Sequence, residues 1–493
     1  MDVSKKMDSH RFLWLTIFLI IVSHAAFLTL PPKSMHLWRQ CNTLAMARNL
    51  FEEGMNPLLP RVDNRLDTDG ITGSQFPSFE FGLASLYWIT GEQFWVQRSY
   101  CLLLAIFGML GMYALAKQLT GNRLFSVLVA WTYAWSPLLF YYSITALPDD
   151  LALPCSIWGL FFFLKWVEQW VIHEQNNTVW MIGSLVLLTL TGLTKIQYLA
   201  VGFFMATYLG LQKDKLRLSH WLVFSGFGII CCALSITWYL YANYLIEISG
   251  LKDFGLEFKP EDNFRRGLST LFSNLTQNLP ESLLNYASFG LLLAGCFYLF
   301  HSRNGNRTIR MSLFSWSLAF CCYHIIELRQ MEYHDYYMMA YLPLLALASA
   351  YGAWHLFQTK WKHYALLLVL IQPALAFVRI VPSRFLTEET DDKQVFYQQE
   401  PLNRLQHCVP QNALCVVGPD DSRCIYFYFL NKKGFGFGQE GIQGAQLKEY
   451  IQRGARYLYI SENQIAENQD ISPYLDHLIC NERNFYVYSL KIY

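Results

Sequence analysis

The fold class follows from residues 101–164, which read CLLLAIFGMLGMYALAKQLTGNRLFSVLVAWTYAWSPLLFYYSITALPDDLALPCSIWGLFFFL. Three apolar runs lie in this stretch, and only a basic break at residues 117–123 and a turn at residues 148–150 (PDD) separate them. A helix needs about 20 apolar residues to cross the hydrocarbon core of a bilayer. The pattern therefore predicts consecutive membrane-spanning helices joined by very short loops.

The whole chain has the composition of a membrane protein. Of its 493 residues, 53% are hydrophobic, 16% are aromatic and only 15% are charged, whereas soluble proteins carry about 25% charged residues. The formal net charge is +1, so no basic surface indicates a nucleic-acid partner. We predict a mainly α polytopic membrane protein with about eleven spans. The expected spans are residues 11–30, 97–117, 124–145, 151–171, 178–194, 196–212, 219–244, 281–301, 311–327, 336–357 and 363–381.

Basic residues in the short connections orient these spans, because cytoplasmic loops carry an excess of Lys and Arg. Lys and Arg gather in four places: residues 117–123, 213–217, 303–310 and 360–362. With the N-terminus inside and eleven crossings, all four clusters face the cytoplasm. Three longer hydrophilic segments then lie outside: residues 31–96, 245–280 and 382–493.

Residues 76–90 (FPSFEFGLASLYWIT) allow two interpretations of the topology. The segment is too short and too polar to span comfortably, so we expect an amphipathic helix that lies in the membrane interface. If it crosses the membrane instead, every later segment changes side and the basic clusters move outside.

The C-terminal segment, residues 383–493, predicts a small α/β extracytoplasmic domain next to a transmembrane domain of residues 1–382. We expect strands at residues 414–418, 456–461 and 484–492, and helices at residues 422–430 and 448–454. Residues 434–441 (GFGFGQEG) are interpreted as a turn, since they follow a predicted helix and not the strand that a dinucleotide-binding loop requires. Four cysteines could form disulfides if this domain faces an oxidising compartment: Cys408, Cys415, Cys424 and Cys480.

Polar residues gather in the expected outer loops. The first loop supplies Arg39, Gln40, Asn42, Arg61, Asp63, Gln75 and Glu80, and the shorter loops supply Asp149, Asp150, Lys195, His334, Asp335, Tyr336 and Tyr337. Each residue alone has a plain structural interpretation, because acids between spans are often solvated, lysines snorkel and tyrosines form interfacial belts. Basic residues on the outer side nevertheless run against the usual bias, and an anionic ligand would explain them.

Six motifs occur in order along residues 38–337: WRQCNTLAMARNLFEEG, PRVD, QFPSFEFG, SPLLFYYSITALPDDLAL, LTK and HDYY. In these motifs the chain resembles the GT-C class of membrane glycosyltransferases, in the branch that includes protein O-mannosyltransferases and the lipid A aminoarabinose transferase. The resemblance covers about residues 1–380. It implies juxtamembrane helices in the first outer loop, a polyprenyl-phosphate sugar donor, and inverting transfer to a lipid, glycan or protein acceptor.

The resemblance also implies roles for individual residues. Asp149 matches the second-loop acid, which would act as general base or orient the acceptor. Relatives tend to read W-R-Q-A-D-T where this chain has Asn42, and E-F-P where it has Gln75, so the first-loop acid is either Asp63 or Glu80. The remaining outer residues are expected to bind substrate. The candidates for binding the phosphate are Arg39, Lys195 and His334.

We expect no cofactor, because the enzymes that the chain resembles are metal-independent, although Asp149 and Asp150 together could bind a divalent metal. The alternative function is a transporter or flippase for a lipid-linked sugar, which would place ionisable residues near the middle of its spans; the predicted spans contain almost none. A catalytically inactive, lipid-binding relative is a further alternative, which Asn42 favours. The compact loops favour a bacterial inner membrane.

Overall fold

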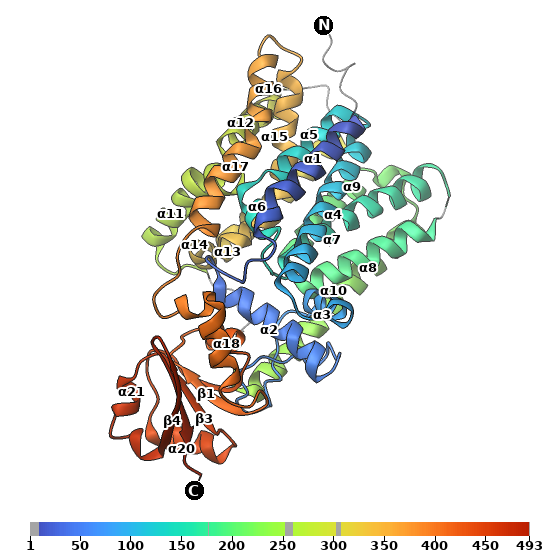
Figure 1. Cartoon of the computed structure of the whole chain (residues 1–493). Coiled ribbons are helices and arrows are strands. Elements are labelled where there is room, and N and C mark those ends of the chain that lie inside the picture. The colour runs from blue at the N-terminus through green and yellow to red at the C-terminus, as the bar shows by residue number, and fades with distance from the viewer. Residues whose placement is uncertain (1–8, 176, 252–259, 302–306, 493) are drawn as a thin grey trace. The chain divides into compact units, whose positions relative to one another are not determined.

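The computed structural model describes residues 9–175, 177–251, 260–301 and 307–492 (Figure 1). The chain divides into two compact units, each built from segments that are far apart in the sequence. The helical unit comprises Met1–Thr29, Phe94–Tyr239 and Glu257–Phe385, and the mixed unit comprises Leu30–Gln93, Leu240–Leu256 and Leu386–Tyr493. The first-loop segment and the C-terminal segment thus share one unit. The expected domain division at residue 382 stays a prediction.

Most of the long helices in the helical unit are strongly apolar. Its elements are α1 (Ser9–His24), η2 (Ala25–Phe27), α4 (Phe94–Thr120), α5 (Arg123–Ala134), α6 (Pro137–Tyr142), α7 (Asp149–Val167), η3 (Glu168–Ile172), α8 (Thr178–Thr194), η4 (Ile196–Ala200), α9 (Val201–Gly210), η5 (Lys213–Lys215), most of α10 (Leu218–Ser249), α11 (Phe264–Ser273), η7 (Asn274–Leu283), α12 (Tyr286–His301), α13 (Arg307–Ile326), α14 (Leu328–Tyr333), η8 (Asp335–Tyr341), α15 (Leu342–Leu356), α16 (Lys362–Leu370), α17 (Gln372–Ile380) and η9 (Val381–Phe385). Small residues let α12 and α15 approach closely, since a Cβ added to Gly295 would lie 2.0 Å from the Ala348 carbonyl oxygen.

Six helices among the described residues are long and apolar enough to cross a membrane. They are His10–Phe27, Phe94–Thr120, Asp149–Ile172, Leu218–Ser249, Arg307–Ile326 and Lys362–Phe385. A seventh is added if Phe264–Leu283 and Tyr286–Leu299, which meet at 115°, form one broken span. The protein is therefore an integral, multi-pass membrane protein. The count of eleven stays a prediction, and residues 303–306 of one basic cluster and 252–259 of the outer segment 245–280 lie outside the described residues.

The expected continuous span at residues 124–145 is wrong, because two helices occupy it. α5 ends at Ala134 and α6 begins at Pro137. Ser136 caps α6, since its hydroxyl accepts the Leu139 N–H at 3.2 Å, and a proline in the first turn of a helix needs no hydrogen-bond acceptor. The Asn285 amide donates to the Trp135 carbonyl at 3.0 Å and so satisfies backbone that the break would leave unpaired.

The mixed unit contains the predicted sheet together with the first-loop helices. Its helical elements are α2 (Leu37–Glu53), α3 (Ser78–Thr90), the end of α10, η10 (Gln394–Tyr397), α18 (Gln399–His407), α19 (Ile425–Leu430), α20 (Gly444–Gln452), α21 (Gln464–Glu467) and η11 (Ser472–Tyr474). Its strands are β1 (Leu414–Gly418), β2 (Lys433–Gly436), β3 (Tyr457–Ile460), β4 (Leu475–Glu482) and β5 (Phe485–Leu490). They form one sheet in the order β2-β1-β3-β5-β4, in which β1 runs parallel to β2 and β3, and β5 runs antiparallel to β3 and β4.

The turn predicted at residues 434–441 is wrong for its first three residues, because residues 434–436 belong to strand β2. Gly434 sits so close to β1 that an added Cβ would lie 1.9 Å from the Cys415 carbonyl oxygen. On its other side Gly434 donates to the Asp63 carbonyl at 3.0 Å and accepts from the Arg65 N–H at 2.6 Å. The glycine that suggested a turn is therefore required by close backbone packing on both sides.

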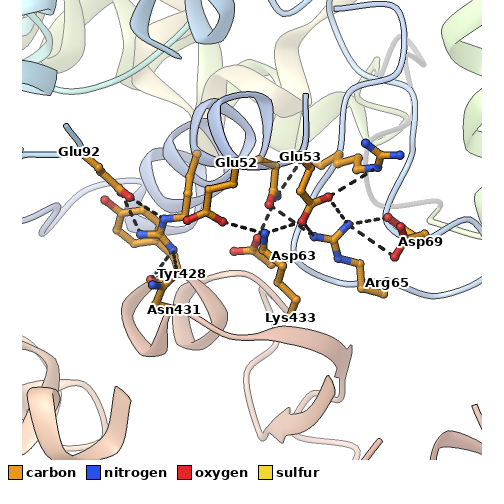
Figure 2. A network of polar contacts seen from close by, with 12 residues as sticks. Glu52, Glu53, Asp63, Arg65, Asp69, Glu92, Tyr428, Asn431 and Lys433 are labelled. Atoms are coloured by element: carbon orange, nitrogen blue, oxygen red, sulfur yellow. Dashed lines mark hydrogen bonds and ion pairs between the residues drawn. The ribbon is translucent and has the colours of Figure 1, made fainter. Parts of the chain in front are cut away.

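Charged side chains join the first-loop segment to the C-terminal segment inside the mixed unit (Figure 2). Buried Arg48 on α2 binds Glu92 at 2.9 Å and donates to the Tyr428 carbonyl and the Asn431 side chain, both at 3.1 Å. At the end of α2, Glu53 pairs with Arg65 at 2.5 Å, and Lys433 of β2 pairs with Glu53 and with Glu52. These contacts explain why the two segments form one compact unit.

Candidate functional site

Asp149 is the centre of the polar cluster in the helical unit. It begins α7, where the helix N-terminus favours a carboxylate, and it is fully buried. Tyr198 of η4 donates its hydroxyl proton to Asp149 Oδ1 at 3.0 Å. Lys195 Nζ lies 3.7 Å from Asp149 Oδ2. The Tyr198 hydroxyl and the Lys195 ammonium, both from the break between α8 and α9, thus contact the carboxylate in the first turn of α7.

Lys195 also lies against the aromatic residues of the HDYY motif. Its ammonium is 5.7 Å from the ring centre of Tyr336 and 5.6 Å from that of Tyr337, which is within the range of cation–π attraction. The His334 ring stacks on Tyr337 with centroids 5.8 Å apart. The structure therefore brings together Asp149, Lys195 and three aromatic candidates of the HDYY motif.

Asp335, the second residue of this motif, is held by two residues that were not among the predicted site residues. Tyr142 of α6 donates to Asp335 Oδ1 at 2.5 Å, and Arg384 of η9 forms an ion pair with Oδ2. The Arg384 guanidinium also lies 4.6 Å from the Tyr141 ring centre. Arg384 follows the last predicted span, which ends at residue 381. Its position as a basic residue just after an apolar run was the only local sign of a role.

Asp150 has different surroundings from its neighbour. It is buried, and its Oδ2 accepts the Leu147 N–H at 3.3 Å, so it closes the turn before α7. Adjacent residues of a helix point in different directions, and the two carboxylates accordingly have separate partners. Across the described ranges, no group of three or more His, Cys, Asp or Glu residues is arranged to hold a metal ion.

In the mixed unit, three first-loop candidates form one hydrogen-bonded chain. Arg39 of α2 donates to Gln75 Oε1 at 2.7 Å, and Gln75 Nε2 donates to Glu80 Oε1 at 3.1 Å. Glu80 lies in the first turn of α3 and is fully buried. Ser74 adds a second donor to Gln75 Oε1 at 2.7 Å. A cation and an acid are therefore linked through the Gln75 amide.

Asp63 is buried in a different network of the same unit. Asn49 donates to Asp63 Oδ1 at 2.9 Å, and the Asp63 carbonyl accepts the Gly434 N–H of β2. Burial raises the pKa of the Asp63 carboxyl, and the Arg48 guanidinium and the Asn49 hydrogen bond oppose that rise. The backbone of Asp63 thus extends the edge of the sheet while its side chain braces α2.

The other first-loop candidates have mainly local contacts. Gln40 donates to the carbonyls of Lys33 and Met35 at 3.0 and 2.9 Å and so braces the turn before α2. Arg61 lies 3.6 Å from Glu53. Asn42 is buried on α2, and its side-chain amide forms no hydrogen bond with any residue that the structure describes.

Comparison with known proteins adds the family context. The family model for dolichyl-phosphate-mannose-protein mannosyltransferase matches residues 75–238. None of the curated proteins matches the chain. ArnT from Cupriavidus metallidurans bound to undecaprenyl phosphate superposes with a TM-score of 0.63 at 12% identity, over 97% of each chain. The chain has the GT-C fold.

Two further structures share the GT-C fold with this chain. The oligosaccharyltransferase of Archaeoglobus fulgidus matches with a TM-score of 0.61 at 12% identity, over 93% of this chain and 70% of that one. The arabinofuranosyltransferase AftD from Mycobacteria matches with a TM-score of 0.56 at 14% identity, over 98% of this chain and 40% of that one. The expected resemblance to the GT-C class is therefore confirmed.

Proposed function

We propose that the protein is an inverting membrane glycosyltransferase that moves a sugar from a polyprenyl-phosphate donor to a lipid, glycan or protein acceptor on the extracytoplasmic face. The GT-C fold, the mannosyltransferase family model and the similarity to ArnT bound to undecaprenyl phosphate support this donor class. The observation that carries the proposal is a buried acid, Asp149, paired with the partly buried Lys195 at the end of a membrane-length helix.

The acid of this pair is suited to receive the acceptor proton. Tyr198 fixes Oδ1, whereas Oδ2 accepts no hydrogen bond within the part of the chain that the structure describes. As the acceptor hydroxyl attacks the anomeric carbon, its proton passes to Oδ2 and the bond between sugar and phosphate breaks. The polyprenyl phosphate leaves with the electron pair of that bond, and the anomeric centre inverts because the hydroxyl attacks from the face opposite the phosphate.

The role assigned to Lys195 is to stabilise the leaving phosphate. An ammonium at the membrane boundary stabilises the negative charge of the departing phosphate. Lys195 is attracted to Asp149 before the donor binds, so a bound phosphate would draw the ammonium from Oδ2 and release the base. The Tyr336 and Tyr337 rings favour the position of the ammonium, and Asp335 holds their segment through Tyr142 and Arg384.

Glu80 is our choice for the first-loop acid. It is linked through Gln75 to Arg39, and all three lie in motifs that resemble those of the class. Asp63 instead bonds to Asn49 and to the backbone of β2, which favours a structural role.

Binding of undecaprenyl phosphate to the purified full-length protein tests the donor class. Lys195→Met should weaken binding about 10- to 100-fold, because a hydrogen bond to a charged group contributes about 1.5–3 kcal/mol. Lys165→Met is the matched control, since Lys165 pairs with Glu168 at 3.1 Å near the other end of α7 and should bind like wild type. Equal binding by the Lys195 variant would refute the assignment of the phosphate site.

Product analysis separates an enzyme from a flippase. A glycosyltransferase incubated in detergent with polyprenyl-phosphate sugars and a mixed acceptor extract releases free polyprenyl phosphate. A flippase leaves the bond between sugar and phosphate intact, so recovery of unchanged donor under saturating acceptor would favour the transport alternative.

A further inference from the structure

Cys408 and Cys480 face one another in the mixed unit and belong to neither polar cluster described above. Cys408 directly follows α18, Cys480 lies on β4, and both are partly exposed. An ion pair at 3.0 Å between Arg404 of α18 and Glu482 of β4 holds these two elements together. The two thiols thus come from elements that are fixed against each other although they are far apart in the sequence.

The register of the sheet places both sulfurs on one face. Tyr459 of β3 pairs with Val487 of β5, and Val487 pairs with Cys480, so the three residues form a row across the sheet. Residues that are directly opposite on neighbouring strands point to the same side. The Cys408 sulfur lies 3.7 Å from the Tyr459 hydroxyl, which donates to the Leu405 carbonyl at 2.9 Å. Cys408 therefore lies over the row that ends in Cys480.

The two thiols differ in reactivity. A hydrogen bond from Cys480, with help from the Lys432 ammonium, lowers the pKa of the Cys408 thiol to about 7. The same hydrogen bond, together with burial, raises the pKa of Cys480. Since the thiolate is the nucleophile in disulfide exchange, Cys408 would react first and Cys480 second.

An external reagent can reach Cys408. A cavity of about 540 Å³ opens beside it and is lined by Gln406, His407, Cys408, Val409 and Asn431 among others. By contrast Cys415, on the same sheet, is completely buried, and burial raises its pKa to about 12. Cys424 donates its thiol proton to the Trp38 carbonyl at 3.3 Å and is also buried. Of the four cysteines of this segment, Cys408 and Cys480 thus have both access and a partner.

We propose that Cys408 and Cys480 are a dithiol–disulfide exchange site that closes to a disulfide by reaction with an external disulfide. The Cys408 thiolate attacks one sulfur of the external disulfide, whose other sulfur leaves as a thiolate. Cys480 loses its proton and attacks the Cys408 sulfur of the resulting mixed disulfide, which releases the second external thiolate. Two protein thiols are oxidised to one disulfide, and the external disulfide is reduced to two thiols by the two electrons transferred.

The test uses the purified full-length protein in detergent and oxidised glutathione as the probe. After incubation, acid quenching and alkylation of free thiols, mass spectrometry of the digested protein should find a Cys408–Cys480 cross-link and alkylated Cys415 and Cys424. Closing should raise the thermal midpoint by at least about 5 °C relative to the reduced protein. Free thiols at both positions after oxidation would overturn the proposal, as would a link from either one to Cys415.

Single variants test the order of attack. Cys480→Ser should trap one glutathionyl group on Cys408, because the second attack is impossible. Cys408→Ser should leave Cys480 largely unmodified under the same conditions. Cys415→Ser is the matched control and should form the cross-link as wild type does. Equal glutathionylation of Cys408 and Cys480 in the two variants would contradict the assigned order.

Discussion

Asp149 and Asp63 are both buried acids that accept one side-chain hydrogen bond on Oδ1, yet their surroundings favour different roles. Asp149 has a tyrosine and a lysine as partners, and the lysine carries a positive charge that an anionic ligand would attract. Asp63 bonds to an asparagine, and its own backbone is fixed in the edge of a sheet. Burial of an acid therefore does not identify a reactive site. The charge of its partners and the attachment of its own backbone distinguish the two.

The largest expected effect is on the transfer rate, and it tests the reactive role of Asp149. Asp149→Asn keeps the shape and the Tyr198 hydrogen bond but cannot accept the acceptor proton, so transfer should fall about 10²–10⁴-fold. Asp150→Asn is the matched control, because an amide oxygen can still accept the Leu147 N–H, and most of the transfer rate should remain. Transfer assays with full-length protein measure both. If Asp149→Asn transfers sugar at the wild-type rate while Glu80→Gln is inactive, the general base lies in the first loop.

The next largest effect is on the free energy of unfolding, and it tests the structural role of the charged network in the mixed unit. Arg48→Met leaves Glu92 and the Tyr428 carbonyl without their buried donor, and breaking a buried ion pair costs about 3–5 kcal/mol. Arg217→Met removes an exposed pair with Glu174 and should cost less than about 1 kcal/mol. Denaturant unfolding of the full-length protein compares the two variants. Equal midpoints would show that the network in Figure 2 does not stabilise the mixed unit.

The helical unit could be predicted from the sequence to the extent that its determinants are local. Apolar runs and their polar ends located α4, α7 and α10, and they also drew attention to Asp149 and Lys195. The break at Ser136 was missed because its surroundings are as apolar as a span, and the polar groups that satisfy it come from distant residues. Arg384 was missed because its partner, Asp335, is 49 residues away in the sequence.

The mixed unit could be predicted less completely, since its contacts join distant segments. Strands β1, β3 and β5 carry β-branched or aromatic residues and were found at nearly their observed positions. Strand β2 carries two glycines, and no local propensity marks it as a strand; it depends on pairing with β1 and on the loop around Asp63. For the same reason the sequence could not separate Asp63 from Glu80.

A moderate effect is expected at Glu80. Glu80→Gln removes the charge at the end of the Arg39–Gln75 chain, and the loss of a charge-assisted hydrogen bond should lower transfer about 10- to 100-fold. The double variant Gln75→Glu/Glu80→Gln moves the acid to residue 75, beside Arg39. Transfer by the double variant should exceed that of the single variant. A double variant as inactive as Glu80→Gln would show that the acid must stand at residue 80.

The smallest effect, and the sharpest test of the contrast between the two acids, is expected for Asp63→Asn. The amide oxygen still accepts the Asn49 hydrogen bond, and the backbone bonds to β2 do not change, so transfer should stay at the wild-type rate and stability should change by about 1 kcal/mol or less. The sign of this stability change depends on pH.

Because burial raises the pKa of Asp63, the folded protein holds this proton more tightly than the unfolded chain. Asp63 therefore lowers the free energy of unfolding as pH rises from about 4 through the folded-state pKa, and the loss is constant above it. The Asn variant lacks this loss, so its stability relative to wild type should rise over that window when unfolding is measured at several pH values. A variant that loses transfer while keeping its stability would assign Asp63, and not Glu80, to the chemistry.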